Sequence, residues 1–148
     1  MNLLAHRITY HFPDWNQRII TAEEIYDFCE ANGARVIKTD LIEGLGEYRV
    51  HRDIYPVILI NEYIKSTYYA WVLFHEAAHF LLHPISHAKF SDRNQMRKIE
   101  HEANLFAAVA LIPQQLMMMK EAWEIEEVFG YPRQLIMLRK KIFDDYGI

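Results

Sequence analysis

The stretch "WVLFHEAAHFLLHPISH", residues 71–87, decides how the rest of the chain is interpreted. His75, Glu76 and His79 within it fit the pattern H-E-x-x-H. Side chains four residues apart share one face of a helix, so both imidazoles can reach a single zinc ion. Glu76 lies beside them, where a carboxylate can accept a proton from water at the metal. The pattern therefore predicts a catalytic zinc site on a helix.

His83 and His87 continue the four-residue rhythm, but the spacing argues against them as ligands. On a continuous helix His83 lies about 12 Å along the axis from His75, too far for one ion to contact both. A longer zinc motif solves this with a glycine bend, whereas this chain has Leu82 at that position. We therefore interpret His83 as a helix-end histidine near the negative end of the helix dipole, and His87 as a loop residue.

The third ligand is predicted on the next helix, in "IEHEANLFAAVALIP", residues 99–113. Glu100 and Asn104 share a face with small alanines, which would let two helices approach closely enough for a carboxylate to reach the metal. Asn104, one turn further on, is then placed to hydrogen-bond a liganding imidazole. Glu102 is a rival ligand, but it points about 200° away from Glu100 around the helix.

Each of these assignments has a simpler alternative. The first helix is apolar around its circumference, so its histidines and glutamate would be buried and would need partners. Those partners could be hydrogen bonds in an ordinary core helix instead of a metal. Glu100 would be a solvated surface charge if the two helices did not pack together.

The order of predicted elements indicates an α+β fold: a helix, a small sheet and then several helices, in one domain covering residues 1–148. Pro56 suggests a strand start or a sheet edge, and strand 55–61 is a candidate edge that could hold an extended substrate. Helix boundaries are indicated by Thr21 before Glu23 and Glu24, and by prolines after two helical runs. The predicted elements are a helix at 21–33, strands at 34–42, 46–54 and 55–64, helices at 66–83 and 95–112, and tail helices broken at Gly130 and Pro132.

Composition limits the class of protein. The 148 residues are 51% hydrophobic with a net charge of −4, which is typical of a globular domain and not of a nucleic-acid-binding surface. The single cysteine, Cys29, excludes an internal disulfide framework and is expected to be buried. Neither a signal peptide nor an apolar run of the roughly 18 residues needed to cross a bilayer is evident. We therefore expect a soluble cytoplasmic protein.

The tail "EEVFGYPRQLIMLRKKIFDDYG" has the rhythm of a helix-turn-helix motif. It carries four basic residues, but four acidic residues and the acidic whole chain oppose contact with phosphates. A packed helical hairpin is the favoured interpretation, so direct nucleic-acid binding is not expected. The basic residues are Arg133, Arg139, Lys140 and Lys141.

Together, "FHEAAHFLLH" (74–83) and "EHEANLFAAVALIP" (100–113) resemble the ImmA/IrrE-type zinc metallopeptidases. That family has H-E-x-x-H followed by E-x-x-A-[ND]-x-F-A-A and a hydrophobic run ending in proline. Ala78 is a small departure, because many relatives carry glycine there. The likeness extends over roughly residues 20–145 and implies a zincin-like fold with a catalytic Zn2+ ion.

The resemblance also implies roles for the motif residues. His75, His79 and Glu100 would bind the zinc and Glu76 would be the general base. The implied protein is a cytosolic endopeptidase of narrow specificity, often acting on a helix-turn-helix transcriptional repressor encoded nearby. No membrane partner is expected.

Two questions stay open at the level of sequence. The oxyanion formed during hydrolysis needs a further donor, for which Tyr131, His101 and His87 are candidates that the sequence does not distinguish. The rival function is a non-catalytic zinc-containing module that binds a repressor or antitoxin. The motif favours the enzyme, because a structural zinc site has no need for Glu76 and is usually closed by four protein ligands.

Overall fold

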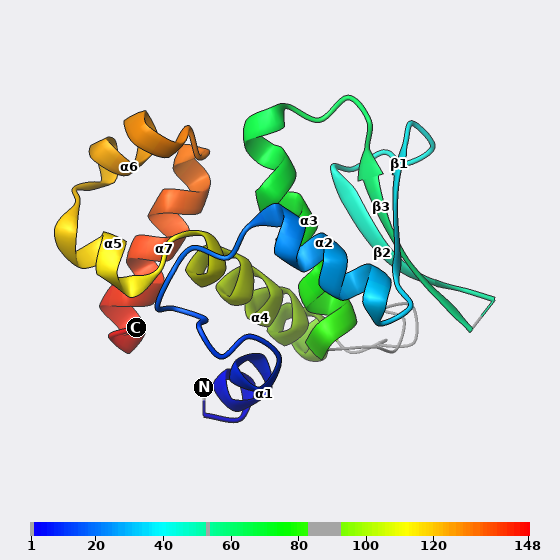
Figure 1. Cartoon of the computed structure of the whole chain (residues 1–148), viewed down its shortest axis with the longest axis horizontal. Helices are drawn as coiled ribbons and strands as arrows, with labels where there is room; N and C mark the ends of the chain where they lie inside the picture. Colours follow the sequence, from blue (N-terminus) through cyan, green and yellow to red (C-terminus); the bar gives the residue numbers. More distant parts are fainter. Residues whose placement is uncertain (1, 53, 83–92) are drawn as a thin grey trace.

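The computed structural model describes residues 2–52, 54–82 and 93–148. Within these ranges the chain forms seven helices and a three-stranded sheet, which confirms the predicted α+β class (Figure 1). The sheet lies on one side of the molecule and the last three helices on the other, with two long helices between them. In chain order the elements are α1 (Asn2–His11), α2 (Ala22–Ala31), β1 (Arg35–Thr39), β2 (Gly46–His51), β3 (Tyr55–Asn61), α3 (Ser66–Leu82), α4 (Arg93–Leu111), α5 (Gln114–Met119), α6 (Ala122–Phe129) and α7 (Arg133–Tyr146).

Helix α2 begins where the sequence predicted. Thr21 accepts a hydrogen bond from the backbone of Glu24 through its hydroxyl, and the Glu24 carboxylate accepts one from the backbone of Thr21. This reciprocal pair satisfies two backbone N–H groups at the helix start. The helix ends at Ala31 and is capped by Asn32, and Gly33 follows with a φ of +89°, which glycine adopts without steric cost.

The sheet has the strand order β1-β3-β2, with β3 parallel to β1 and antiparallel to β2. The expectation that 55–61 is an edge strand is therefore wrong: β3 is the central strand, and β2 is the edge next to α3. The alternative interpretation of Pro56, a position at the start of a strand, is confirmed, because it is the second residue of β3. The ladder to β1 begins at the pair Arg35–Val57, one residue after Pro56, so its missing N–H removes no bond to β1.

One face of the sheet is buried by helices. Tyr48 and Ile58 lie opposite each other on this face, and Ile60 follows on the same side. All three are at most 5% exposed, because α2 packs against β1 and α3 packs against β2 and β3. This packing places the edge strand β2 directly beside the helix that carries the H-E-x-x-H residues.

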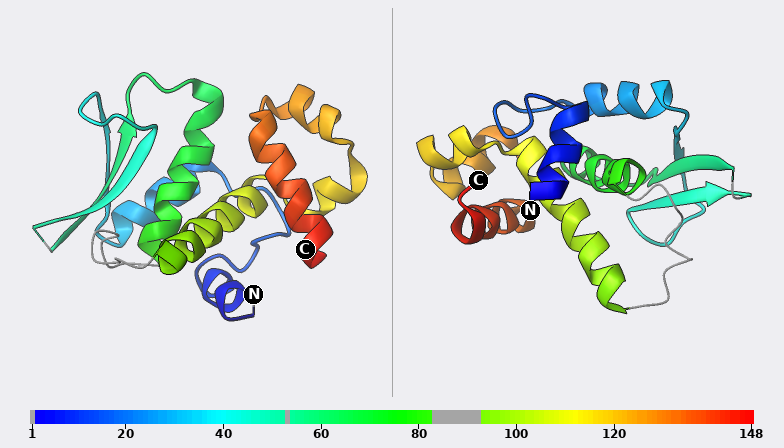
Figure 2. Two further views of the ribbon diagram at one scale, coloured as in Figure 1. Left: turned by 180° about the vertical axis from the view of Figure 1, so that it is seen from behind. Right: turned by 90° about the horizontal axis from the view of Figure 1, so that it is seen from below.

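Helices α3 and α4 cross in the middle of the molecule (Figure 2). Both helices carry fully buried alanines, including Ala78 on α3 and Ala103 and Ala107 on α4. Small side chains let helix axes approach closely. The two predicted blocks of the sequence are thus brought together at this crossing.

The first helix, α1, was not predicted. It has no acidic residue in its first turn, so the usual start signal is missing. Tertiary contacts hold it instead: Ile8 is fully buried, and Arg7 donates a hydrogen bond of 3.2 Å to the carbonyl of Leu82 at the end of α3. Cys29 is fully buried, as predicted.

The tail forms α5, α6 and α7, with breaks at Gly130 and Pro132 as predicted. Arg139 is fully buried, so it presents no charge to a phosphate. Lys140 and Lys141 are paired with acidic residues one turn further along α7.

In the part of the chain that the structure describes, no helix combines the length and the apolar character needed to cross a membrane.

Candidate metal centre

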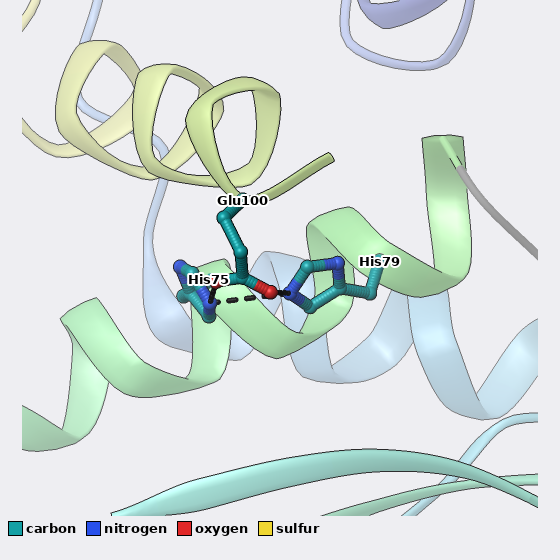
Figure 3. A group of neighbouring side chains, drawn as sticks. All are labelled: His75, His79 and Glu100. Carbon is teal, nitrogen blue, oxygen red and sulfur yellow. Dashed lines mark hydrogen bonds and ion pairs between the residues drawn. The ribbon is translucent and has the colours of Figure 1, made fainter. Parts of the chain in front are cut away.

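Three side chains converge at the crossing of α3 and α4 (Figure 3). His75 and His79 extend from adjacent turns of α3, and Glu100 reaches down from α4 so that its carboxylate lies between the two rings. The Nε2 atoms of the two histidines are 3.2 Å apart. The two carboxylate oxygens of Glu100 divide these contacts: Oε2 lies 3.2 Å from His75 Nε2, and Oε1 lies 3.2 Å from His79 Nε2.

This geometry fits a metal ion. Ligand atoms about 2.0–2.1 Å from a tetrahedral zinc are about 3.3–3.4 Å from one another, close to the 3.2 Å separations found here. Two imidazoles and one carboxylate are also a donor set that zinc prefers at catalytic sites. His75, His79 and Glu100 would therefore hold a zinc ion without rearrangement of the two helices.

The group is buried on one side and open on the other. The His79 side chain is 1% exposed and that of His75 is 19% exposed, whereas Glu100 keeps 44% of its side chain in contact with solvent. A catalytic zinc needs three protein ligands and one position left for water or substrate. The solvent-exposed side at Glu100 provides access for such a molecule.

Electrostatics within the group favour a carboxylate that stays ionised. Hydrogen bonds to His75 and His79 hold the pKa of Glu100 well below its ordinary value. Burial lowers the pKa of His75, but the hydrogen bond to Glu100 and the charges of Glu76 and Glu100 outweigh burial, so this pKa is raised. A hydrogen bond from His75 to the Asn104 side chain acts in the same direction. Of the two imidazoles that the sequence left open as partners of Asn104, this one is His75.

Glu76 lies on the inner side of the group, next to the edge strand. It is 8% exposed, and burial raises the pKa of its carboxyl to about 7, against the opposing charge of His75. The backbone of Tyr48 on β2 hydrogen-bonds the same carboxylate. A carboxyl with a pKa near 7, fixed beside a metal site, has the acidity that a general base and acid requires.

The candidate oxyanion donors do not join this group in the described residues. The Tyr131 hydroxyl donates to the carbonyl of Leu111 at 3.2 Å, about 16 Å further along α4 than Glu100 at about 1.5 Å per residue. His101 follows Glu100 but interacts with the Tyr146 hydroxyl on α7. His83 and His87 lie outside the described residues. Glu102, the rival ligand, lies 4.0 Å from Lys98 on its own helix.

Sequence reasoning missed the contribution of β2. Gly46 and the backbone of Tyr48 contact the region of Glu76, and Leu45 lines a cavity beside it. The sequence predicts a turn in "EGLG", residues 43–46, followed by a strand at 46–54, but not the contact of this segment with Glu76. Nothing local in the sequence indicates which helix such a turn will contact.

Residues 29–139 match the sequence profile of the Peptidase_M78 family, described as the IrrE N-terminal-like domain. The match covers well over half of the 148 residues and includes both ligand-bearing helices. The chain belongs to this family. The resemblance inferred from the two sequence blocks is thereby confirmed, and membership supports a metal-dependent peptidase as the general class.

One solved structure with the same fold is a Mycobacterium tuberculosis transcriptional regulator. It superposes with a TM-score of 0.64 at 14% sequence identity, over 94% of this chain and 47% of the regulator. The present chain thus spans about half the length of that protein, and the likeness concerns the fold alone. No curated protein sequence matches this chain.

Proposed function

We propose that this protein is a zinc-dependent endopeptidase that hydrolyses a peptide bond in a specific intracellular protein. The observation that carries the proposal is the convergence of His75, His79 and Glu100, with Glu76 buried beside them. We assign the three to zinc and Glu76 to acid–base catalysis. In this proposal residues 1–148 act as one zincin-like metallopeptidase domain located in the cytoplasm, in keeping with a single, unpaired cysteine.

Bound zinc would act as a Lewis acid that polarises the scissile carbonyl and acidifies the attacking water. Glu76 takes up the proton of that water and returns it to the leaving amine. Burial and the Tyr48 backbone keep its carboxylate in one orientation during both transfers. Asn104 holds the His75 ring in place through its side chain.

The edge strand β2 is the proposed support for the substrate backbone. β2 pairs with β3 on one side, and its first residue, Gly46, lies against Glu76. An extended segment that adds to the free edge of a sheet gains main-chain hydrogen bonds. Addition to β2 would carry a substrate peptide past Glu76 and the metal group. Residues 55–61 cannot take this role, because β3 is paired on both sides.

The proposed substrate is a helix-turn-helix transcriptional repressor. Support comes from the ImmA/IrrE resemblance together with the shared fold of a protein described as a transcriptional regulator. Direct binding of this domain to nucleic acid is not part of the proposal, because the basic residues of the tail are buried or paired with acids.

The test replaces Glu76 with Gln, which preserves the shape of the side chain and removes its basicity. Wild type and the variant are produced at equal levels in cells that contain the native substrate, and newly formed protein N-termini are identified by labelling and mass spectrometry. We expect equal zinc content, with repressor fragments from wild type only. If zinc-loaded wild type yields no new N-termini, the proposal of a peptidase is contradicted. If E76Q still relieves repression as wild type does, the non-catalytic binding module is the correct function.

A further inference from the structure

A cavity of about 230 Å³ opens beside the proposed zinc ligands. Its wall includes His75 and Glu76, so it is continuous with the proposed catalytic group. Asn104 borders it from α4, and the rest of the wall comes from Leu45 and Gly46 of the edge strand region and from Trp71 and Val72, one turn before His75. The mechanism proposed above makes no use of this cavity.

We propose that this cavity binds one side chain of the substrate next to the scissile bond and selects an apolar residue there. The inference rests on the proposed function, because it assumes that a peptide lies at the zinc group. A small-molecule site usually occupies about 300–1,000 Å³, so the smaller cavity here suits a single side chain.

The walls determine which side chain the cavity accepts. Leu45, Trp71 and Val72 present hydrocarbon surface, and among the described residues no lysine or arginine lines the cavity. An acidic substrate side chain would therefore lose its hydration without gaining a cation. It would also lie beside the side chain of another acid, Glu76, which lines the cavity. An apolar side chain avoids both costs and gains from burial.

The inner end of the cavity is closed by contact between strand and helix. A Cβ atom at Gly46 would lie 2.5 Å from Val72 Cγ1, which shows that β2 and α3 are already in contact there. Val72 is 8% exposed and belongs to the hydrophobic core. Leu45, by contrast, is half exposed at the mouth of the cavity. The depth is thus fixed by the fold, whereas Leu45 can be changed without disturbing the core.

The test measures binding of hydroxamates to the zinc-loaded protein by calorimetry. Acetohydroxamate reports on the open metal position alone. Two further series, N-acyl amino-acid hydroxamates and 2-substituted succinyl hydroxamates, place a side chain on opposite sides of the zinc-binding group. In one of the two series we expect leucine or phenylalanine side chains to bind about ten to one hundred times more tightly than glycine or glutamate.

Two leucine variants test whether the preference for an apolar side chain arises at this cavity. Leu45→Lys adds a cation at the cavity mouth and is expected to reduce the preference for a leucine over a glutamate side chain by about tenfold. Leu41→Lys is the matched control, because Leu41 is 88% exposed and does not line this cavity. It should leave the preference unchanged.

The outcomes separate this inference from the proposed function. If acetohydroxamate fails to bind the zinc-loaded protein, the proposed catalytic site is wrong. If acetohydroxamate binds but neither series discriminates between side chains, the site stands and the apolar pocket is overturned. Equal effects of Leu45→Lys and Leu41→Lys would also overturn it, since the selection would then not arise at this cavity.

Discussion

Gly46 lies against Glu76 with no room for a side chain between them. A Cβ atom at Gly46 would be 3.0 Å from Glu76 Cγ and 3.3 Å from Glu76 Oε1. Its backbone has no positive φ, so space and not backbone conformation requires glycine at this position. The position of the proposed general base therefore depends on one residue of the neighbouring strand.

Gly46→Ala is expected to destabilise the protein by about 1–3 kcal/mol, because overpacking at a rigid contact forces strand and helix apart. Since the displaced atoms include those of Glu76, the loss of peptidase activity should exceed the loss of zinc binding. Thermal unfolding, zinc content and cleavage rate measure the three effects. Gly44→Ala is the control: its Cβ would meet its nearest neighbour at 3.8 Å, an ordinary contact. A G46A protein with wild-type melting temperature would contradict the packing argument.

Glu100→Gln should weaken zinc binding by more than about 100-fold, because it neutralises one of three ligands, whereas loss of outer-shell partners alone costs about 10–100-fold. Glu102→Gln changes the same type of residue on the same helix, outside the three-residue group, and should bind zinc as wild type does. Competition with a chromophoric chelator gives both affinities. The stabilisation that zinc adds to wild type should also shrink in E100Q, because a ligand stabilises the folded state in proportion to its affinity. Equal affinities for the two variants would remove Glu100 from the site.

Arg139→Met is expected to cost about 2–4 kcal/mol of unfolding free energy, because it leaves buried carbonyl groups without their charged donor. The Arg139 guanidinium donates to the Ile112 carbonyl at the end of α4, to the Ile148 carbonyl, and to the Asn16 side chain. Arg133→Met is the control, since the Arg133 side chain is 78% exposed. Urea unfolding measures both. Similar values for the two variants would show that the buried hydrogen bonds contribute little.

Cys29 should not react with a thiol reagent in the folded protein at pH 8. Burial raises the pKa of Cys29 to about 12. The thiolate fraction at pH 8 is then about one in ten thousand. Because the folded-state pKa lies above the unfolded value, the associated stability is present below about pH 8.5 and is lost as the pH rises toward 12. Cys29→Ala should therefore lose less stability than wild type between these values. Rapid labelling of native protein at pH 8 would contradict the burial.

The central part of the fold follows from local signals in the sequence. Thr21 with Glu24 marks the start of α2, and the alanine-rich face around Ala103 predicts that α4 can approach α3. The spacing of His75 and His79 together with this alanine-rich face predicts the convergence of Glu100 with the histidines, because helical periodicity fixes which side chains share a face.

The remaining features depend on contacts between distant segments. β3 is the central strand because it pairs with both β1 and β2. The residues of β3 alone are equally compatible with an edge strand. Helix α1 is held by Ile8 and by the Arg7 contact to Leu82, which local sequence does not reveal. The closeness of Gly46 to Glu76 likewise arises only when the sheet packs on α3.

The three proposed ligands belong to just two helices, so the crossing of α3 and α4 sets both distances from Glu100 to the histidines. Zinc affinity would consequently report how α3 and α4 are packed. A larger side chain at buried Ala103 or Ala107 moves the helices apart, and the 3.2 Å separations at Glu100 lengthen with it. Substitutions that never touch the metal would then change its occupancy while the chain remains folded. The zinc content of a variant would then indicate whether its core keeps α3 and α4 at their native separation.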